Sequence, residues 1–231
     1  ELAPLGDVFV VAPEHEQSAS SHRITLSGPL RHRALGGSFH AVDGTPADCV
    51  YIALNLTGLL PRRPDVIVSG INHGLNLGDD VTYSGTVAAA FEGVLLGWPS
   101  IAVSQQATNR EHWDTGTAHY DFRGVCNFVA NLVPRVADPS FPRHMLLNVN
   151  APGEAPDGLR GAVATRLGRR IYNDELQLQE EVDGRRKYLI YGDSPGHHVE
   201  QGTDFAAIED LRISVTPLHF DLTDTVGVGQ V

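Results

Sequence analysis

The chain has 231 residues, of which 42% are apolar and 19% are charged, proportions typical of a folded globular protein. Its formal net charge of -11 disfavours binding to a nucleic-acid duplex, where basic patches supply most of the affinity. The same charge is compatible with a small phosphorylated ligand whose anion is neutralised locally by a metal ion or by backbone amides. Since no apolar run approaches the about 18 uncharged residues of a membrane helix, we expect a soluble protein with no membrane partner.

The start of the chain and its two cysteines bear on its origin. Residues 1–6 read like the end of a helix and lead at once into a strand-like run, so we expect further sequence to precede Glu1. Cys49 and Cys126 lie far apart, each in a run with the pattern of a buried helix. Such thiols favour core packing over a disulfide or a metal site, and they indicate a cytoplasmic protein.

Short apolar runs alternate with helical patterns through the first part of the chain. Strands are predicted at 7–12, 65–69, 100–104 and 145–149. Helices are predicted at 46–56, 85–96 and 117–136. The last helix has an apolar face at helical spacing, made by Val125, Phe128, Val129, Leu132, Val133 and Val136. The alternation predicts an α/β fold with a doubly wound, mostly parallel sheet, whose ligands bind beyond the carboxyl ends of its strands.

The pattern changes after this core, which we assign to residues 1–155, and an extension follows at 156–231. An alternating polar stretch at 171–193, with Asp183-Gly184 near its middle, predicts a long hairpin. Further elements are predicted at 161–166 (strand), 203–209 (helix) and 212–216 (strand). The hairpin has no evident core of its own, so we expect it to pair with a neighbouring subunit, with a solvated flap as the alternative.

Polar loops follow two of the predicted strands. The loop after 7–12 carries Ser18, Ser20, Ser21, His22 and Arg23, and by itself it also reads as an ordinary serine-rich surface loop. The loop after 65–69 is more informative, because its repeated glycines permit close backbone approach or positive φ. It also carries possible ligand side chains, namely Asn72, His73, Asn76, Asp79 and Asp80.

Ser84, Gly85 and Thr86 lead directly from this loop into an apolar helix. The free amides of a helix's first turn and the positive end of its dipole favour a phosphate group. Ser84 could instead be only an N-cap, which stabilises a helix by about 1 kcal/mol without any ligand. The preceding glycine- and asparagine-rich loop favours the phosphate interpretation.

Several other kinds of site are less well supported. Asp79 and Asp80 suit a hard cation such as Mg²⁺, yet adjacent side chains of an extended backbone point opposite ways, and a role as turn and capping acids is favoured. The histidines include no HExxH pair, which leaves a zinc hydrolase weakly indicated. No GxSxG, GxxxxGK[ST] or GxGxxG motif occurs, which argues against a serine hydrolase, a P-loop NTPase and a dinucleotide-binding enzyme.

Four segments together resemble the survival protein SurE family. They are VVAPEHEQSASSHRITL at 10–26, GTPADCV at 44–50, SGINHGLNLGDDVTYSGTVAAAFEG at 69–93 and TDFAAIEDLRISVTPLHFDLT at 203–223. LNVN at 147–150 and TRLGRR at 165–170 agree as well, so the resemblance covers nearly the whole chain. It departs from the family after Ser18, where ASSHR replaces a frequent glycine, and at Leu211-Arg212, where a glycine and an aromatic residue are expected.

The resemblance implies a Rossmann-like core whose C-terminal hairpin and tail are exchanged between the subunits of a homodimer or homotetramer. It implies a 5'-nucleotidase, a divalent-metal-dependent phosphomonoesterase acting on nucleoside 5'- and 3'-monophosphates. It also implies Ser18 and Asn72 as metal ligands, with two consecutive aspartates of an Asn-Asp-Asp-Gly motif. That acidic pair has no counterpart in this sequence, and we expect it to lie, with the first strand, in sequence before Glu1.

From these parts we expect one divalent cation per subunit, Mg²⁺ or Mn²⁺, held by Ser18 and Asn72, with Asn72 catalytic through it. The phosphate is expected at Asn76, Ser84, Gly85 and Thr86, and Asp79 is the candidate general base if the protein supplies one. Without the acidic pair the cation would be held poorly, so activity is expected of the complete protein. Two alternatives stay open, a phosphatase of broader range and a non-catalytic oligomeric nucleotide- or phosphate-binding protein that has lost the acidic ligands.

Overall fold

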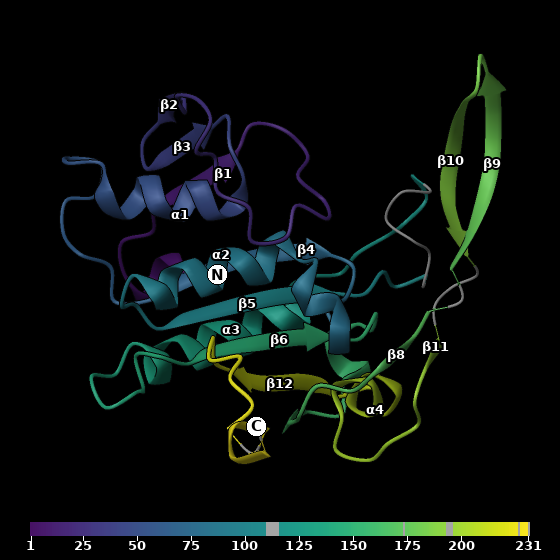
Figure 1. The fold of residues 1–231 in the computed structure, drawn as a ribbon. Coiled ribbons are helices and arrows are strands. Elements are labelled where there is room, and N and C mark those ends of the chain that lie inside the picture. Colours follow the sequence, from purple (N-terminus) through teal and green to yellow (C-terminus); the bar gives the residue numbers. More distant parts are fainter. Residues whose placement is uncertain (110–115, 173, 193–195, 226, 231) are drawn as a thin grey trace.

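The computed structural model describes the chain except for residues 110–115, 173, 193–195, 226 and 231. Its centre is a five-stranded sheet in the order β4-β5-β6-β12-β7. These strands are β4 (Ile67–His73), β5 (Ser100–Gln105), β6 (Leu146–Ala151), β7 (Ala162–Ala164) and β12 (Ile213–Leu218). All neighbours run parallel except β6 and β12, which are antiparallel. The expected α/β class with a mostly parallel sheet is confirmed (Figure 1).

Helices cover both faces of this sheet because alternate residues of its strands point to opposite sides. On β5, Ala102 packs in the cluster that contains side chains of α2 (Gly85–Leu95). Its neighbours Ile101 and Val103 pack in the larger cluster with α3 (Arg123–Val136). Every residue of β5 is buried, which explains why the strand reads as a continuous apolar run.

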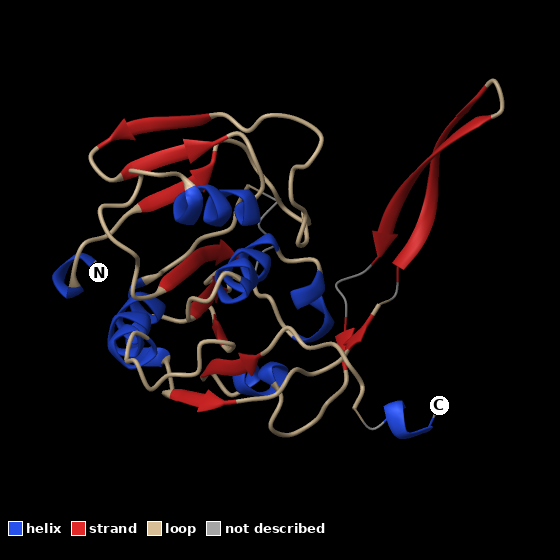
Figure 2. Cartoon of the chain, turned by 60° about the vertical axis from the view of Figure 1, so that its left-hand side comes forward, coloured by secondary structure: helices blue, strands red, loops and turns tan. Residues whose placement is uncertain are grey.

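The first predicted strand forms in a different place from the one expected. β1 (Val10–Pro13) pairs in parallel with β3 (Phe39–Val42) and belongs to a separate sheet in the order β1-β3-β2, with β2 at His32–Gly36. Neither β2 nor β3 was predicted, since β2 is largely exposed and has no apolar run. They are joined at Gly36-Gly37, where both residues have positive φ. α1 (Pro46–Asn55) lies between this sheet and α2 (Figures 1 and 2).

An aspartate lies at the start of two of the helices. Thr45 and Asp48 form a capping box at the start of α1, as the S/T-x-x-D/E type of spacing favours. α3 begins at Arg123 rather than at 117, and the Asp121 carboxylate just before it accepts hydrogen bonds from the backbone and the guanidinium of Arg123. Cys49 lies buried in α1, and burial raises the pKa of its thiol to about 12, which suits the expected core role.

The C-terminal part divides into segments that join the core and a hairpin that leaves it. The hairpin predicted at 171–193 is present as β9 (Asp174–Val182) and β10 (Arg185–Gly192), although 173 and 193 lie outside the described residues. It projects away from the rest of the molecule (Figures 1 and 2). β7 and β12 instead extend the central sheet, and the division at 155 stays a prediction.

The remaining short elements are β8 (Arg170–Ile171), β11 (Gly196–His197), α4 (Asp204–Glu209) and the 3-10 turns η1 (Ala3–Leu5), η2 (Gly78–Thr82), η4 (Pro156–Gly158) and η5 (Gly227–Gln230). β8 and β11 pair at the base of the hairpin, and α4 packs on β12. Among the described helices, none has the length and apolar character that crossing a membrane requires.

Candidate functional site at the end of strand β4

The end of β4 carries a shift in strand register that depends on one glycine. The pairing of β4 with β5 is interrupted between Ser69 and Asn72. Gly70 lies within this interruption with φ of +121°, and a Cβ added there would lie 2.4 Å from the carbonyl oxygen of Val103. Any larger residue would therefore push the strands apart. Asn72 and its neighbour then resume the pairing at the carboxyl end of the strand.

Asn72 connects this strand end to the first turn of α2. Its side-chain oxygen accepts a hydrogen bond of 3.2 Å from the Thr86 hydroxyl, and its amide donates to the carbonyl oxygen of Gly74. Ser84 is the N-cap of α2, since its hydroxyl accepts the backbone N–H of Val87 at 3.1 Å. The structure thus brings together Asn72, Ser84, Gly85 and Thr86, as the sequence predicted.

The serine-rich loop after β1 lies against the same helix start. Ser21 donates from its backbone N–H to the Tyr83 carbonyl and from its hydroxyl to the Thr82 carbonyl. Ser20 Oγ is buried without a hydrogen-bond partner among the described residues, and it lies 2.8 Å from where a Cβ of Gly85 would be. This hydroxyl therefore lies beside Gly85 at the start of α2 with unused bonding capacity. The sequence placed Ser20 in a loop of interest but could not separate it from its neighbours.

Two buried carboxylates hold that loop in place. Asp48 accepts the backbone N–H and the hydroxyl of Thr25, at 2.9 and 2.7 Å, and it is only 1% exposed. Burial alone would raise the pKa of Asp48, but its hydrogen bonds from Thr25 and Thr45 outweigh burial and lower it. Glu92 of α2, also buried, lies 2.9 Å from Nε2 of His22. The loop is therefore fixed before any ligand arrives.

Ser18, the other expected metal ligand, lies on the exposed part of this loop. Its hydroxyl and its backbone N–H both donate to one carboxylate oxygen of Glu16, at 2.7 and 2.9 Å. The bond from the Ser18 hydroxyl is the main cause of the lowered pKa of Glu16. Because the hydroxyl proton points to Glu16, the lone pairs of Ser18 Oγ are left for another partner.

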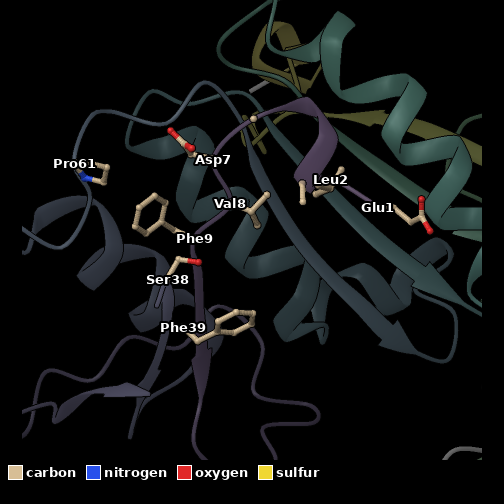
Figure 3. A pocket seen from close by; sticks show the side chains of 10 residues that line it. Glu1, Leu2, Asp7, Val8, Phe9, Ser38, Phe39 and Pro61 are labelled. Atoms are coloured by element: carbon tan, nitrogen blue, oxygen red, sulfur yellow. The ribbon is translucent and has the colours of Figure 1, made fainter. Parts of the chain in front are cut away.

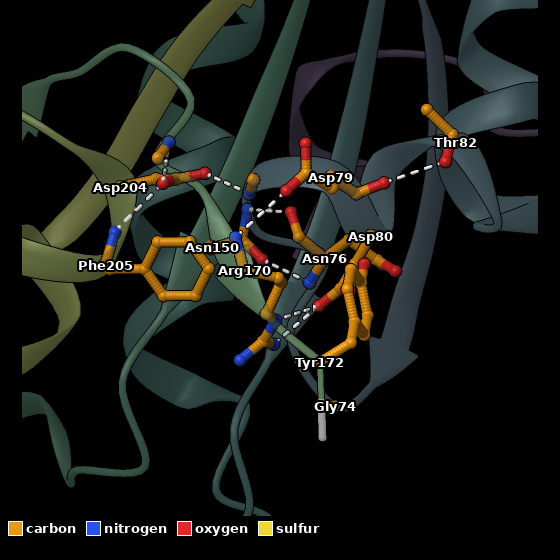
Figure 4. Close-up of polar contacts among 12 residues, drawn as sticks. Gly74, Asn76, Asp79, Asp80, Thr82, Asn150, Arg170, Tyr172, Asp204 and Phe205 are labelled. Atoms are coloured by element: carbon orange, nitrogen blue, oxygen red, sulfur yellow. Dashed lines mark hydrogen bonds and ion pairs between the residues drawn. The ribbon is translucent and has the colours of Figure 1, made fainter. Parts of the chain in front are cut away.

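Asn76 occupies a more buried position than a substrate-binding role suggests. It is 7% exposed, and its side-chain amide donates to the hydroxyl of Ser104 at 2.7 Å. Its backbone N–H donates to the side-chain oxygen of Asn150, while its carbonyl accepts bonds from Asn148 and Asn150 (Figure 4). These contacts make Asn76 part of a buried polar layer that supports the loop from below.

Asp79 and Asp80 lie in η2 and point toward the base of the hairpin. Asp79 accepts the backbone N–H of Arg170 at 2.9 Å, and Asp80 pairs with the Arg170 guanidinium. The Tyr172 hydroxyl also donates to Asp80 (Figure 4), and burial together with the negative charge of Asp80 raises the pKa of Tyr172 to about 12. These contacts give the two acids a structural role that differs from the turn and capping role favoured from the sequence, since they bind a segment about 90 residues away in the chain.

Asp204 at the start of α4 completes the support of the loop. Its fully buried carboxylate accepts the backbone N–H groups of Gly78 and Gly168, both at 2.8 Å. Burial raises the pKa of this carboxyl in spite of those hydrogen bonds. A Cβ at either glycine would collide with the ring of Phe205, so the loop and the turn before β8 are clamped to α4.

The oxygens expected to bind a cation fit it only in part. Ser18 Oγ and Asn72 Oδ1 are hard oxygen donors of the kind that Mg²⁺ and Mn²⁺ accept. Both are neutral, and within the part of the chain that the structure describes no group of three His, Cys, Asp or Glu side chains is placed to hold a metal. The two residues can therefore contribute to a cation site but do not complete it.

A hollow of about 800 Å³ elsewhere on the molecule is not part of this site. It lies beside the N-terminal segment and the starts of β1 and β3 (Figure 3). Its lining consists of Glu1, Leu2, Ala3, Gly6, Asp7, Val8, Phe9, Ser38, Phe39 and Pro61. None of the predicted site residues belongs to this lining.

The fold is that of an α/β protein in which the end of β4 meets the first turn of α2 at the carboxyl end of a parallel sheet. The model of the family described as survival protein SurE matches residues 1–174, and the chain belongs to the SurE family. The 5'-nucleotidase SurE of Rubrobacter xylanophilus is 47% identical over all of this chain and 88% of its own length. That of Laribacter hongkongensis is 46% identical over 96% of this chain and 85% of its own.

A solved structure agrees with this assignment. The crystal structure of the SurE protein from Aquifex aeolicus superposes with a TM-score of 0.82 at 36% sequence identity. The match covers all of this chain and 89% of that one. The fold expected from the resemblance is therefore shared with an experimentally determined member of the family.

Proposed function

We propose that this protein is a metal-dependent 5'-nucleotidase that hydrolyses nucleoside 5'- and 3'-monophosphates to nucleoside and phosphate. The observation that carries the proposal is the Asn72–Thr86 hydrogen bond, which fixes a strand-end amide beside the first turn of α2. The relatives from Rubrobacter xylanophilus and Laribacter hongkongensis bear the name 5'-nucleotidase, so a non-catalytic binding protein is not favoured.

The first turn of α2 is the proposed phosphate-binding position. Ser84 Oγ already accepts the N–H of Val87, so the N–H groups of Gly85 and Thr86 are those that an α-helix leaves free at its start. Ser20 adds a buried hydroxyl beside Gly85. Hydrolysis of a phosphomonoester depends mainly on positioning the phosphoryl group and neutralising its charge. These groups supply both without a covalent intermediate.

We assign Ser18 and Asn72 as two ligands of one divalent cation per subunit, Mg²⁺ or Mn²⁺. The family resemblance implies that an acidic pair completes the ligand set. When bound, such a cation withdraws charge from a phosphate oxygen and acidifies a coordinated water. Glu16 orients the Ser18 hydroxyl by accepting its hydrogen bond, and Thr86 orients Asn72 by donating to its oxygen. Asn76 supports the site from the buried layer below rather than from its surface.

Asp79 is the proposed general base only if the protein supplies one. Its carboxylate accepts a hydrogen bond from the backbone of Arg170, which favours an anchoring role. An Asp79→Asn variant decides between the two roles. If Asp79 is the general base, the variant should have a lower kcat than the wild type at the pH values where the base is deprotonated. Unchanged kcat across pH would end the catalytic assignment.

The hairpin supports a homo-oligomer, a dimer or a tetramer. Leu176, Leu178, Val182 and Tyr188 are between 48% and 69% exposed on it. A two-stranded hairpin is at best marginally stable in water, so a second subunit that covers these side chains would stabilise it. A cytoplasmic location, suggested by the two free thiols, stays a prediction.

The proposal is tested by phosphate release from 5'-AMP and 3'-AMP with full-length protein, in Mn²⁺, in Mg²⁺ and in excess chelator. We expect release from both nucleotides that depends on the divalent cation and disappears in chelator. Full activity in chelator would contradict the metal-dependent mechanism. Binding of 5'-AMP without release under any of these conditions would instead support the non-catalytic alternative.

A further inference from the structure

Three aromatic rings stack beside the candidate site. The His73 ring lies 4.6 Å from the ring of Tyr120 and 5.6 Å from that of Phe122, measured between centroids. The interplanar angles are 20° and 15°, and the rings of Tyr120 and Phe122 lie at only 8° to each other. All three rings are therefore close to parallel, with His73 stacked over both of the others.

This stack is supported from one side and open on the other. Phe122 packs against the core cluster under α3, and Tyr120 is half-buried. His73 is exposed, although its backbone is fixed by pairing with Gln105 of β5. His73 is the exposed member of the stack, and Tyr120 and Phe122 hold the orientation of its ring. The structure thus holds a flat aromatic surface in a fixed orientation toward solvent.

The position of His73 relates this surface to the proposed phosphate-binding position. His73 follows Asn72, so their Cα atoms are about 3.8 Å apart, and successive side chains of a strand point to opposite sides. Asn72 points to Thr86 of α2, whereas His73 points to the segment before α3. His73 also lies within electrostatic range of Glu16, from the loop that carries Ser18. The aromatic surface therefore lies near the loop that carries Ser18 and follows Asn72 directly along the strand.

We propose that His73, backed by Tyr120 and Phe122, stacks against the nucleobase of the bound nucleoside monophosphate. The inference rests on the proposed function and deepens it, because it assigns the part of the substrate that distinguishes a nucleotide from other phosphomonoesters. Every base has a π face, so stacking of this kind holds purines and pyrimidines alike. It accounts for binding of the base with no hydrogen-bond readout of its identity.

The test compares His73→Ala with the wild type on two substrates that differ only in the base. For 5'-AMP we expect KM to rise about tenfold with kcat within about twofold, the scale of one lost base stack. For ribose 5-phosphate, used as substrate or as competitor of 5'-AMP, we expect no change in affinity. His73→Phe should restore the wild-type KM for 5'-AMP because it restores the ring.

A matched control is His32→Ala, which removes another stacked histidine, one whose ring lies 5.0 Å from that of His40 in the separate sheet. His32→Ala should change neither KM for 5'-AMP nor the affinity for ribose 5-phosphate. An equal loss of affinity for both substrates in His73→Ala, or no loss for 5'-AMP, would overturn the inference. If the wild type released no phosphate, the proposed function would fail by itself, and calorimetric titration of 5'-AMP into both proteins would still decide the stacking role.

Discussion

The loop that carries Ser18 and the β9–β10 hairpin are both polar excursions from the core, yet they are held in opposite ways. The loop is tied along its length, by Ser21 to the start of α2 and by Thr25 to the buried Asp48. Among the described residues, the hairpin meets the core at its base, where the Arg170 guanidinium pairs with Asp80. The first arrangement fixes the loop against α2, and the second leaves apolar side chains of the hairpin exposed.

The largest expected effect follows from closing the space between the loop and α2. In Gly85→Ala the new Cβ would lie 2.8 Å from Ser20 Oγ and 3.0 Å from Cγ of Pro46, so the Ser20 hydroxyl and its surroundings must shift at the helix start. We expect kcat/KM for 5'-AMP to fall about 100-fold, the cost of a misplacement near 1 Å. Gly28→Ala is the control, because a Cβ there meets nothing within 4 Å. Wild-type activity in Gly85→Ala would show that the helix start does not bind the phosphate.

The next effect concerns the anchor of the same loop. Asp48→Asn keeps the shape of the side chain but replaces one acceptor by a donor that faces donors from Thr25 and Thr45. We expect the free energy of unfolding to fall by about 2 kcal/mol, measured by chemical denaturation. Asp43→Asn is the control, since Asp43 pairs with the exposed Arg31, and it should cost less than about 1 kcal/mol.

The acid dependence of this effect has a definite sign. The pKa of Asp48 is lower in the folded protein, so its ionised form stabilises the fold above the unfolded-state value near pH 4. That contribution is lost as the pH falls through the folded-state pKa. The difference in stability between the wild type and Asp48→Asn should therefore shrink in acid. A constant difference from pH 7 to pH 3 would contradict the assignment.

Substitutions in the hairpin are expected to have a smaller effect on the stability of the monomer and a measurable effect on self-association. Leu176 and Leu178 lie on one face of β9, and Tyr188 of β10 is paired with Leu178 on that face. Replacing both leucines by glutamate should weaken self-association, measured by light scattering over a range of concentrations. Gln177→Glu, on the opposite face, should leave association unchanged. Unchanged self-association of the double variant would show that the hairpin is not part of the interface.

Comparison with the sequence shows what local patterns reveal about the fold and what they miss. Continuous apolar runs predicted β4, β5 and β6, and the helical apolar face predicted α3, because burial on both faces leaves a strong signal. β2 and β3 left none, since their pairing depends on a partner strand and a Gly-Gly turn. The start of α3 was placed six residues too early, because the apolar spacing identifies the face of the helix and not its first turn.

The residues of the candidate site could be named in part for a similar reason. Asn72 and the 84–86 helix start were identified as candidates because loop, glycines and cap are contiguous in sequence, and the structure places them together. The layer that supports them joins Asn76 to Ser104, Asn148 and Asn150 across three segments, and Asp204 reaches Gly78 from α4. The aromatic stack joins β4 to the segment before α3. Contacts between distant segments have no periodic signature, so only the structure identifies them.

The central claim, that the end of β4 and the start of α2 form the active site of a nucleotidase, is tested most directly by one comparison. It is kcat/KM for phosphate release from 5'-AMP in Mn²⁺, measured for full-length wild type, Asn72→Ala and the control Asn55→Ala, an exposed amide at the end of α1. We predict a loss of about 100-fold or more in Asn72→Ala with an unchanged melting temperature, and no loss in Asn55→Ala. Wild-type activity in Asn72→Ala would contradict the claim and place the active site elsewhere.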